Sequence, residues 1–207
     1  MVSLNDYADL PGDSQEYEIL SEAAWSTAQL MGLTCEIGLR QGRGSAIILN
    51  ARATMGRPAT HVAIDPYGNL EYSPNDTARV RLDYTNDMKE LALANLHLLA
   101  AQTHSCIYYF CLTDTAFMAR YKDGVPVYDE HVLLVNDYSL VHFDGPHTTR
   151  DVQLETEFFA DKAVMGAKFV YDDVDSYDHG KVDSWLLKEG WEVSRKGTRK
   201  ISYRRYR

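Results

Sequence analysis

Five aspartates follow short apolar runs, at the places where buried strands of an alternating α/β chain would end. They are Asp65, Asp114, Asp144, Asp172 and Asp173. In a mainly parallel sheet, the carboxyl ends of the strands share one edge, and ligands bind outside that edge. Carboxylates gathered there would repel one another unless they bind hydroxyl groups, a cation or a metal ion. The sequence therefore predicts a binding edge that is rich in carboxylates.

A glycine-rich turn follows the first predicted strand. It reads EIGLRQGRGS over residues 36–45, with glycines at positions 38, 42 and 44. This spacing differs from the G-x-G-x-x-G of dinucleotide-binding folds, and the sequence has no Walker lysine motif. Neither a nicotinamide or flavin site of the usual kind nor a triphosphate cradle is therefore predicted.

The elements that must position these residues alternate between apolar runs and amphipathic segments. The patterns predict strands at 33–39, 60–66, 106–114, 138–144 and 166–173, and helices at 14–32, 46–55, 87–102, 148–164 and 179–190. Residues 191–207 indicate a terminal hairpin, whereas 67–81 indicate a long connection and 115–137 have no assignable pattern. We expect one domain over 1–207, with 1–32 as an N-terminal helical lead-in. Its fold class is α/β, a doubly wound, mostly parallel seven-stranded sheet with a C-terminal antiparallel hairpin.

Composition and charge narrow the classes of function. The 207 residues carry a net charge of −9, which disfavours a general nucleic-acid binder. The segment 195–207 nevertheless holds seven Lys or Arg residues and no acidic residue. This basic tail is either an exposed hairpin whose charges discourage edge-to-edge pairing or a site for an anionic substrate, RNA or a polymer.

The sequence has no feature of an exported or membrane-spanning protein. It contains no run of 18 apolar residues, and its first residues, MVSLNDYADLPGDSQEYE, are acidic where a secretory signal would be basic and then apolar. We expect a cytoplasmic protein. Cys35, Cys106 and Cys111 lack metal-ligand spacing, and reduced core thiols are expected, with Cys35 and Cys106 inside predicted strands.

Four phrases in a fixed order resemble a known family. EIGLRQGRGS resembles the first motif, E-x-G-x-x-x-G-x-(G/S), of class I S-adenosylmethionine-dependent methyltransferases; VAIDP resembles their second motif, and LVHFDGPH and FVYDD resemble the later pair. The most similar group known to us is that of the macrocin O-methyltransferase-like and cephalosporin hydroxylase-like proteins. The resemblance covers residues 30–178 and implies a Rossmann-like methyltransferase fold, in which the last strand is reversed.

The resemblance implies an S-adenosylmethionine site at the glycine turn. Gly38, Gly42 and Gly44 would let the backbone approach the cofactor, with Ser45 at the start of the following helix. Glu36 would either fix the turn or bind the amino group of the cofactor.

Further residues of the cofactor site follow from the same resemblance. Asp65 would bind the ribose hydroxyls, as an acid after the second strand does in dinucleotide folds, or would cap a turn. Asp114 would border the adenine. His142 alternates with Phe143 inside a strand and is expected to be a packed core histidine.

Metal-dependent relatives bind one magnesium ion with an aspartate after the fourth strand and an acidic pair after the fifth. Asp144, Asp172 and Asp173 occupy those positions. The ion would bind the acceptor oxygen, lower its pKa and align it with the methyl group. The alternative is a solvated acidic loop that binds no metal.

The catalytic base is the point at which this sequence departs from its relatives. Pro146 stands where some relatives have an aspartate that serves as the base, and His147 is next in line. His147 would take the acceptor proton, bind the metal or begin a helix. We expect a magnesium-dependent O-methyltransferase with His147 and Asp144 as catalytic residues, acting on a hydroxyl of a small molecule or a sugar. The alternatives are a non-catalytic binding or scaffold protein and a methyltransferase that binds nucleic acid through the basic tail.

Overall fold

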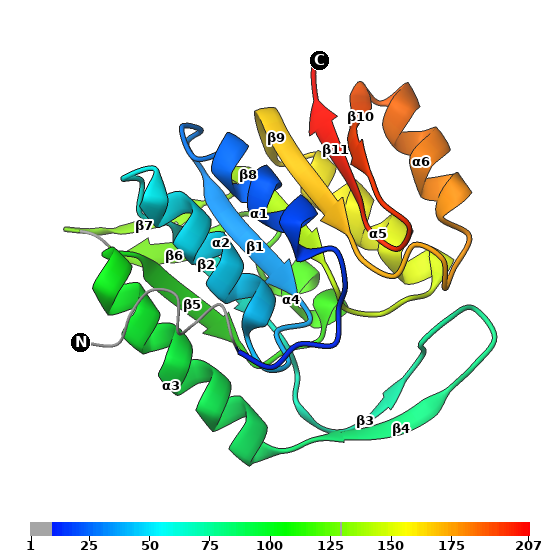
Figure 1. Cartoon of the computed structure of the whole chain (residues 1–207), viewed down its shortest axis with the longest axis horizontal. Coiled ribbons are helices and arrows are strands. Elements are labelled where there is room, and N and C mark those ends of the chain that lie inside the picture. The colour runs from blue at the N-terminus through cyan, green and yellow to red at the C-terminus, as the bar shows by residue number, and fades with distance from the viewer. Residues whose placement is uncertain (1–9, 129) are drawn as a thin grey trace.

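The centre of the protein is a mixed seven-stranded sheet. The computed structural model describes residues 10–128 and 130–207. The strands of the sheet are β1 (Leu33–Ile37), β2 (Thr60–Ile64), β5 (Cys106–Phe110), β8 (Tyr138–Phe143), β9 (Ala163–Tyr171), β10 (Trp191–Lys196) and β11 (Ile201–Arg205). The order across the sheet is β10-β11-β9-β8-β1-β2-β5 (Figure 1). The first five of these strands in the chain are parallel, and β11 pairs antiparallel with both β9 and β10. The predicted fold class is confirmed.

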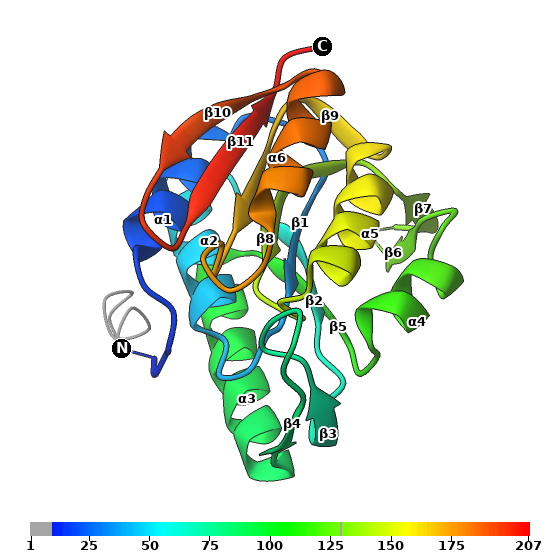
Figure 2. The ribbon, with the colours of Figure 1, turned by 90° about the vertical axis from the view of Figure 1, so that its right-hand side faces the viewer.

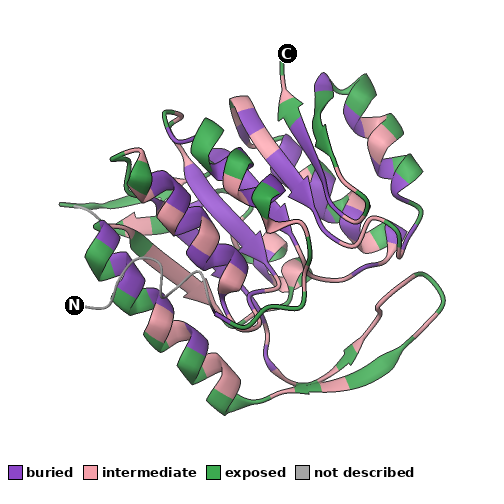
Figure 3. Ribbon diagram, in the orientation of Figure 1, coloured by how far each residue is buried: buried purple, intermediate pink, exposed green. Residues whose placement is uncertain are grey.

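Helices cover both faces of the sheet. Helices α1 (Tyr17–Ser26), α2 (Arg43–Thr54) and α3 (Asn86–Thr103) lie on one face, and α4 (Asp114–Arg120), α5 (Thr149–Ala160) and α6 (His179–Lys188) lie on the other (Figures 1 and 2). Because both faces are covered, every residue of β1 and of β8 is buried (Figure 3).

The two faces of the sheet differ in composition because side chains alternate along each strand. On the face under α2, Glu36 of β1 and His61 of β2 form hydrogen bonds with Ser45 of α2. On the face under α5, aromatic rings pack together; the rings of Phe143 and Tyr171 stack with centroids 4.5 Å apart. We call these the polar face and the apolar face.

Two hairpins interrupt the alternation of strands and helices. Strands β3 (Gly68–Tyr72) and β4 (Val80–Tyr84) form one, and β6 (Val125–Tyr128) and β7 (Val132–Val135) form the other. The long connection predicted over 67–81 therefore contains a strand and the start of a second one, which the sequence analysis did not predict. The β3–β4 hairpin lies near the carboxyl ends of the parallel strands (Figures 1 and 2).

The tip of the β3–β4 hairpin is tied to the main body. Asp76 accepts hydrogen bonds from the backbone N–H and the hydroxyl of Thr149, at 2.7 and 2.6 Å, and from the N–H of Asp178. Its carboxylate thus lies at the start of α5, where free backbone N–H groups favour a negative charge.

Two predicted helix ends were wrong. The lead-in helix covers Tyr17–Ser26 instead of 14–32, because the buried Arg52 side chain holds the carbonyl groups of Thr27, Ala28 and Leu30 in a non-helical segment. Residues 1–9 of the predicted lead-in lie outside the described residues. The helix predicted to end at 164 ends at Ala160, and the segment 162–168 mostly belongs to β9.

The cysteines are all free, but only one of them is a core residue. Cys35 is buried, whereas Cys106 and Cys111 are exposed, so the expectation of core thiols was wrong for these two. Cys106 is exposed because β5 is the last strand of the sheet. Among the helices of the described residues, none combines the length and the apolar character that crossing a membrane requires.

Candidate active site

A cavity of about 640 Å³ opens at the carboxyl ends of the parallel strands. Its wall contains the glycine turn and Asp65 on one side, and Asp144, His147 and Asp173 on the other. The cavity therefore combines most of the site residues that the sequence predicts. We call the part near β1 and β2, where the sequence predicts a cofactor, the cofactor half, and the part near β8 and β9, where it predicts an acceptor, the acceptor half.

The glycine turn is shaped by close contacts that exclude a side chain. Gly38 has φ +87°, and a Cβ atom there would overlap the carbonyl group of Asp144. A Cβ atom at Gly44 would overlap the carboxylate of Glu36. Gly42 also has positive φ and caps α2 with no side-chain hydrogen bond, so the turn needs glycine at these three positions.

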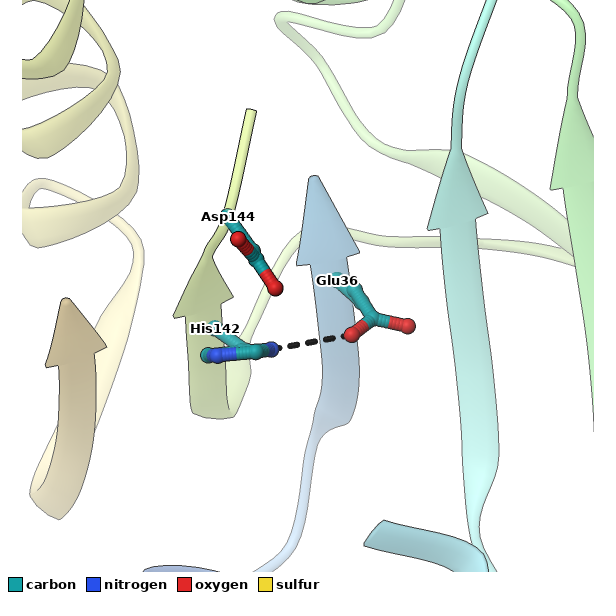
Figure 4. Close-up of side chains that lie close together, drawn as sticks. All are labelled: Glu36, His142 and Asp144. Carbon is teal, nitrogen blue, oxygen red and sulfur yellow. Dashed lines mark hydrogen bonds and ion pairs between the residues drawn. The ribbon is translucent and has the colours of Figure 1, made fainter. Parts of the chain in front are cut away.

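Glu36 fixes the turn, which was one of its two predicted roles. Its Oε2 accepts from the N–H of Ser45 at 2.8 Å and from the Ser45 hydroxyl at 2.5 Å. Its Oε1 lies 2.9 Å from Nδ1 of His142 on the neighbouring strand (Figure 4). Only 1% of Glu36 is exposed, so the carboxylate joins the start of α2 to β8.

These contacts belong to a longer buried network on the polar face. The polar network consists of Thr34, His61, Ser45, Glu36, His142, Lys200 and Asp172. Burial lowers the pKa of His61 to about 4 and lowers the pKa of His142 as well. Both imidazoles are therefore neutral at pH 7, and His142 is the packed core residue that its alternation with Phe143 predicts.

Asp65 also supports the glycine turn. Its carboxylate accepts from the N–H groups of Arg40 and Tyr67, at 2.8 and 2.9 Å, and burial raises its pKa. Each carboxylate oxygen has a second lone pair, and Asp65 lines the cavity. Ribose binding by Asp65 stays a prediction.

Asp114 is the first residue of α4 and borders the cavity next to Thr113. Its carboxyl group is largely buried, which raises its pKa. A role at the adenine stays a prediction.

In the acceptor half, the chain brings four predicted residues together. His147 lies between two carboxylates, with Nε2 at 4.0 Å from Asp144 and Nδ1 at 3.7 Å from Asp173. Burial and the charge of Asp172 raise the pKa of Asp144 well above its usual range. For Asp172, burial acts to raise the pKa, but Lys200 and His142 outweigh it and bring the value to about 2.

His147 has one ring nitrogen in use and one free. Nδ1 lies 2.8 Å from the hydroxyl of Tyr72 in the β3–β4 hairpin, whose hydroxyl also donates to the Gly145 carbonyl at 3.2 Å. Nε2 is buried and has no hydrogen-bond partner among the described residues. Most buried ring nitrogens in folded proteins have a partner, so the unpartnered Nε2 marks His147 as a candidate functional residue.

The β3–β4 hairpin contributes an apolar roof that the sequence analysis missed. Four half-buried residues of this hairpin line the cavity: Leu70, Tyr72, Leu82 and Tyr84. The strand residues that alternate with them, such as Glu71 and Asp83, are exposed. The alternation in GNLEY and VRLDY was a signal for this hairpin, but each run has five residues and turn-forming residues surround it.

The predicted magnesium ligands fit an ion poorly. Asp172 lies 2.9 Å from Nζ of Lys200, and Asp173 forms an ion pair with Arg199. Glu36, His142 and Asp144 offer ligand atoms within 4.8 Å of one another, but Glu36 and His142 are hydrogen-bonded to each other (Figure 4). Asp144 is the one predicted ligand that faces the cavity with no cation beside it in the described residues.

The basic tail is largely neutralised within the chain. Its ion pairs join Arg195 to Glu22, Arg199 to Asp173 and Asp175, Lys200 to Asp172, and Arg204 to Glu192. Arg205 donates to the carbonyl groups of Ala160 and Ala163. Of the two alternatives, the hairpin account describes these contacts better than a free anion-binding patch does.

No family model matches the sequence, and no curated protein is similar to it. Solved structures share its fold. The O-methyltransferase TomG of Streptomyces achromogenes, which is involved in tomaymycin synthesis, is 14% identical with a TM-score of 0.61, and the match covers 98% of this chain and 88% of TomG. An O-methyltransferase of Bacillus cereus in complex with SAH is 9% identical with a TM-score of 0.60, over 99% and 87%. The calicheamicin methyltransferase CalS11 is 14% identical with a TM-score of 0.59, over 91% and 78%. The chain therefore has the predicted fold of class I methyltransferases.

Proposed function

We propose that this chain is an S-adenosylmethionine-dependent O-methyltransferase whose acceptor is a hydroxyl group of a small molecule or a sugar. The fold that it shares with TomG and CalS11 supports this proposal. The observation that carries it is the unpartnered Nε2 of His147, a residue that lines the same cavity as the glycine turn. A cofactor site and a base that share one cavity are what a methyl transfer to oxygen requires.

The residues of the cofactor half suit S-adenosylmethionine. Gly38 lines the cavity without a side chain, the first turn of α2 offers N–H groups to a carboxylate, and Asp65 has lone pairs for the ribose hydroxyls. Asp114 would border the adenine. When bound, S-adenosylmethionine supplies a methyl group that passes to the acceptor oxygen while the carbon–sulfur bond breaks and its electron pair stays on sulfur.

In the proposed reaction, His147 takes the proton of the acceptor hydroxyl. Because the Tyr72 hydroxyl donates to the Gly145 carbonyl, its oxygen accepts from Nδ1–H of His147, and this tautomer leaves the lone pair on Nε2. Burial lowers the pKa of His147, so the imidazole is neutral and basic at pH 7. Asp173 and Asp144 lie on either side of the imidazolium that the proton transfer forms.

The side chains of the β3–β4 hairpin that line the cavity favour an acceptor with an apolar surface. Tyr72 and Tyr84 present aromatic rings, and Leu70 and Leu82 lie opposite each other in the hairpin. Such a surface suits the ring of a sugar or of a small hydroxylated molecule. We propose that the reaction takes place in the cytoplasm. It does not include magnesium, because Asp172 and Asp173, two of the three predicted ligands, each form an ion pair with a lysine or arginine of the chain.

Transfer of an isotopically labelled methyl group to a panel of hydroxylated acceptors, followed by mass spectrometry, tests the proposal. His147→Gln should lower kcat by about 100-fold or more, because the base is lost. His97→Gln, at an exposed position of α3, is the matched control and should leave kcat unchanged. Wild-type turnover by the His147→Gln variant would refute the role of the base, and failure of the wild-type protein to bind S-adenosylmethionine would refute the function.

A further inference from the structure

Lys200 carries a positive charge into the acidic end of the site and is completely buried. Its ammonium nitrogen lies 2.9 Å from Oδ1 of Asp172, 2.9 Å from the hydroxyl of Ser14 and 3.3 Å from Nε2 of His142. An ammonium group has three N–H donors, so each donor has a partner within the chain.

The turn that carries this lysine is held from a distant part of the sequence. The carboxylate of Glu16 accepts hydrogen bonds from the backbone N–H groups of Thr198, Arg199 and Lys200, at 2.8 to 2.9 Å. Arg199, in the same turn, pairs with Asp173. The two cations therefore reach the two carboxylates through a turn that Glu16 fixes in place.

A divalent ion would compete with these contacts. Magnesium is bound by carboxylates and water in an octahedral shell, with ligand distances of about 2.1 Å. An ion bound to Oδ1 of Asp172 would lie within about 5 Å of the Lys200 ammonium, at which distance like charges repel strongly in a buried site. Asp172 is 1% exposed, so it cannot turn toward the cavity without leaving the lysine uncompensated.

We propose that Lys200 is a positioning residue that replaces a divalent metal ion at the carboxyl ends of β8 and β9, so that the acceptor site works without magnesium. This inference rests on the function proposed above. Lys200 keeps Asp172 charged and donates to Nε2 of His142, which leaves Nδ1–H of His142 to donate to Glu36. The cation thereby links the acceptor half of the cavity to the glycine turn.

Binding of Mn²⁺, followed by electron paramagnetic resonance, tests the proposal without any methyl transfer. The wild-type protein and Asp144→Asn should bind Mn²⁺ equally weakly. Lys200→Met should bind it about tenfold more tightly or better, because Asp172 is then free to act as a ligand together with Asp144. The double variant Asp172→Asn/Lys200→Met should lose that gain, and Lys196→Met, an exposed lysine of the same hairpin, should match the wild type.

Two results would overturn the proposal. One is wild-type binding of Mn²⁺ that Asp144→Asn abolishes, and the other is a folded Lys200→Met variant with no gain in affinity. If Lys200→Met does not fold, the Mn²⁺ affinities of the wild type and of Asp144→Asn still test whether the unaltered site binds a divalent ion. Since these titrations need neither cofactor nor acceptor, they stay informative if the proposed methyl transfer fails its own test.

Discussion

The polar face and the apolar face of the sheet are equally buried, yet they have different tasks. On the polar face, hydrogen bonds run from His61 to Ser45, on to Glu36 and His142, and finally to Lys200, and so connect both halves of the cavity. On the apolar face, rings such as Phe143, Phe159 and Phe169 pack against one another. We infer that the apolar face supplies stability and that the polar face shapes the ligand site.

The largest expected effect is on the apolar face. Phe159 is fully buried and contacts Tyr138 and Phe143. Phe159→Ala should lower the free energy of unfolding by about 3 to 4 kcal/mol, because it leaves a cavity. Denaturant unfolding measures this loss, and calorimetry should show S-adenosylmethionine affinity within about twofold of the wild type. A large loss of affinity would contradict the division between the faces.

Glu36→Gln tests the polar face. The amide has one acceptor oxygen where Glu36 has two, so either the contact with Ser45 or that with His142 is lost. We expect a loss of about 2 to 3 kcal/mol in the free energy of unfolding. Unlike Phe159→Ala, this variant should also weaken S-adenosylmethionine binding by about tenfold or more. Glu71→Gln, on the exposed side of β3, is the control, and equal affinities of the two variants would count against the account.

Acid unfolding tests Asp172, the carboxylate at one end of the polar network. The pKa of Asp172 is about 2 in the folded chain and near 3.9 in an unfolded chain. The unfolded state therefore binds more protons between pH 4 and pH 2, so stability is present above pH 4 and is lost as the pH falls. The difference is worth about 2.6 kcal/mol. The double variant Asp172→Asn/Lys200→Met should show a correspondingly smaller loss of stability in this range, and an unchanged loss would refute the assignment.

The last expected effect concerns Glu155, a buried acid within the apolar surroundings. Glu155 of α5 is completely buried, and burial together with Asp114 raises its pKa well above the usual range. The unfolded chain releases this proton at lower pH than the folded chain, so the group lowers stability as the pH rises above 4. Glu155→Gln should therefore become more stable relative to the wild type as the pH rises from 5 to 8, as thermal unfolding at both values would show. A gain that is the same at both pH values would contradict the raised pKa.

Local signals explain what could be predicted from the sequence. The glycine turn, the apolar runs and the terminal aspartates are each contained within about ten residues, and they predict the parallel sheet and both halves of the cavity. The partners of those residues could not be predicted in the same way. Lys200 is distant in sequence from His142, and the contact depends on the register in which Ile201 pairs with Tyr171.

The hairpin that roofs the cavity shows a second reason for failure. Strands β3 and β4 have five residues each and are stabilised by their contacts with the main body, such as those of Tyr72 with His147 and of Asp76 with Thr149. Such tertiary contacts override weak local preference. The sequence left two accounts of the basic tail open for the same reason, because the acidic partners of the tail, such as Glu22 and Asp172, lie elsewhere in the chain.

Calorimetric titration of S-adenosylmethionine and S-adenosylhomocysteine, first with a chelator and then with magnesium, tests the central claim most directly. The account predicts binding with a Kd of about 1 to 100 µM, and the same affinity in both conditions. Binding that requires magnesium would contradict the role given to Lys200. Absence of binding in both conditions would contradict the proposed function itself.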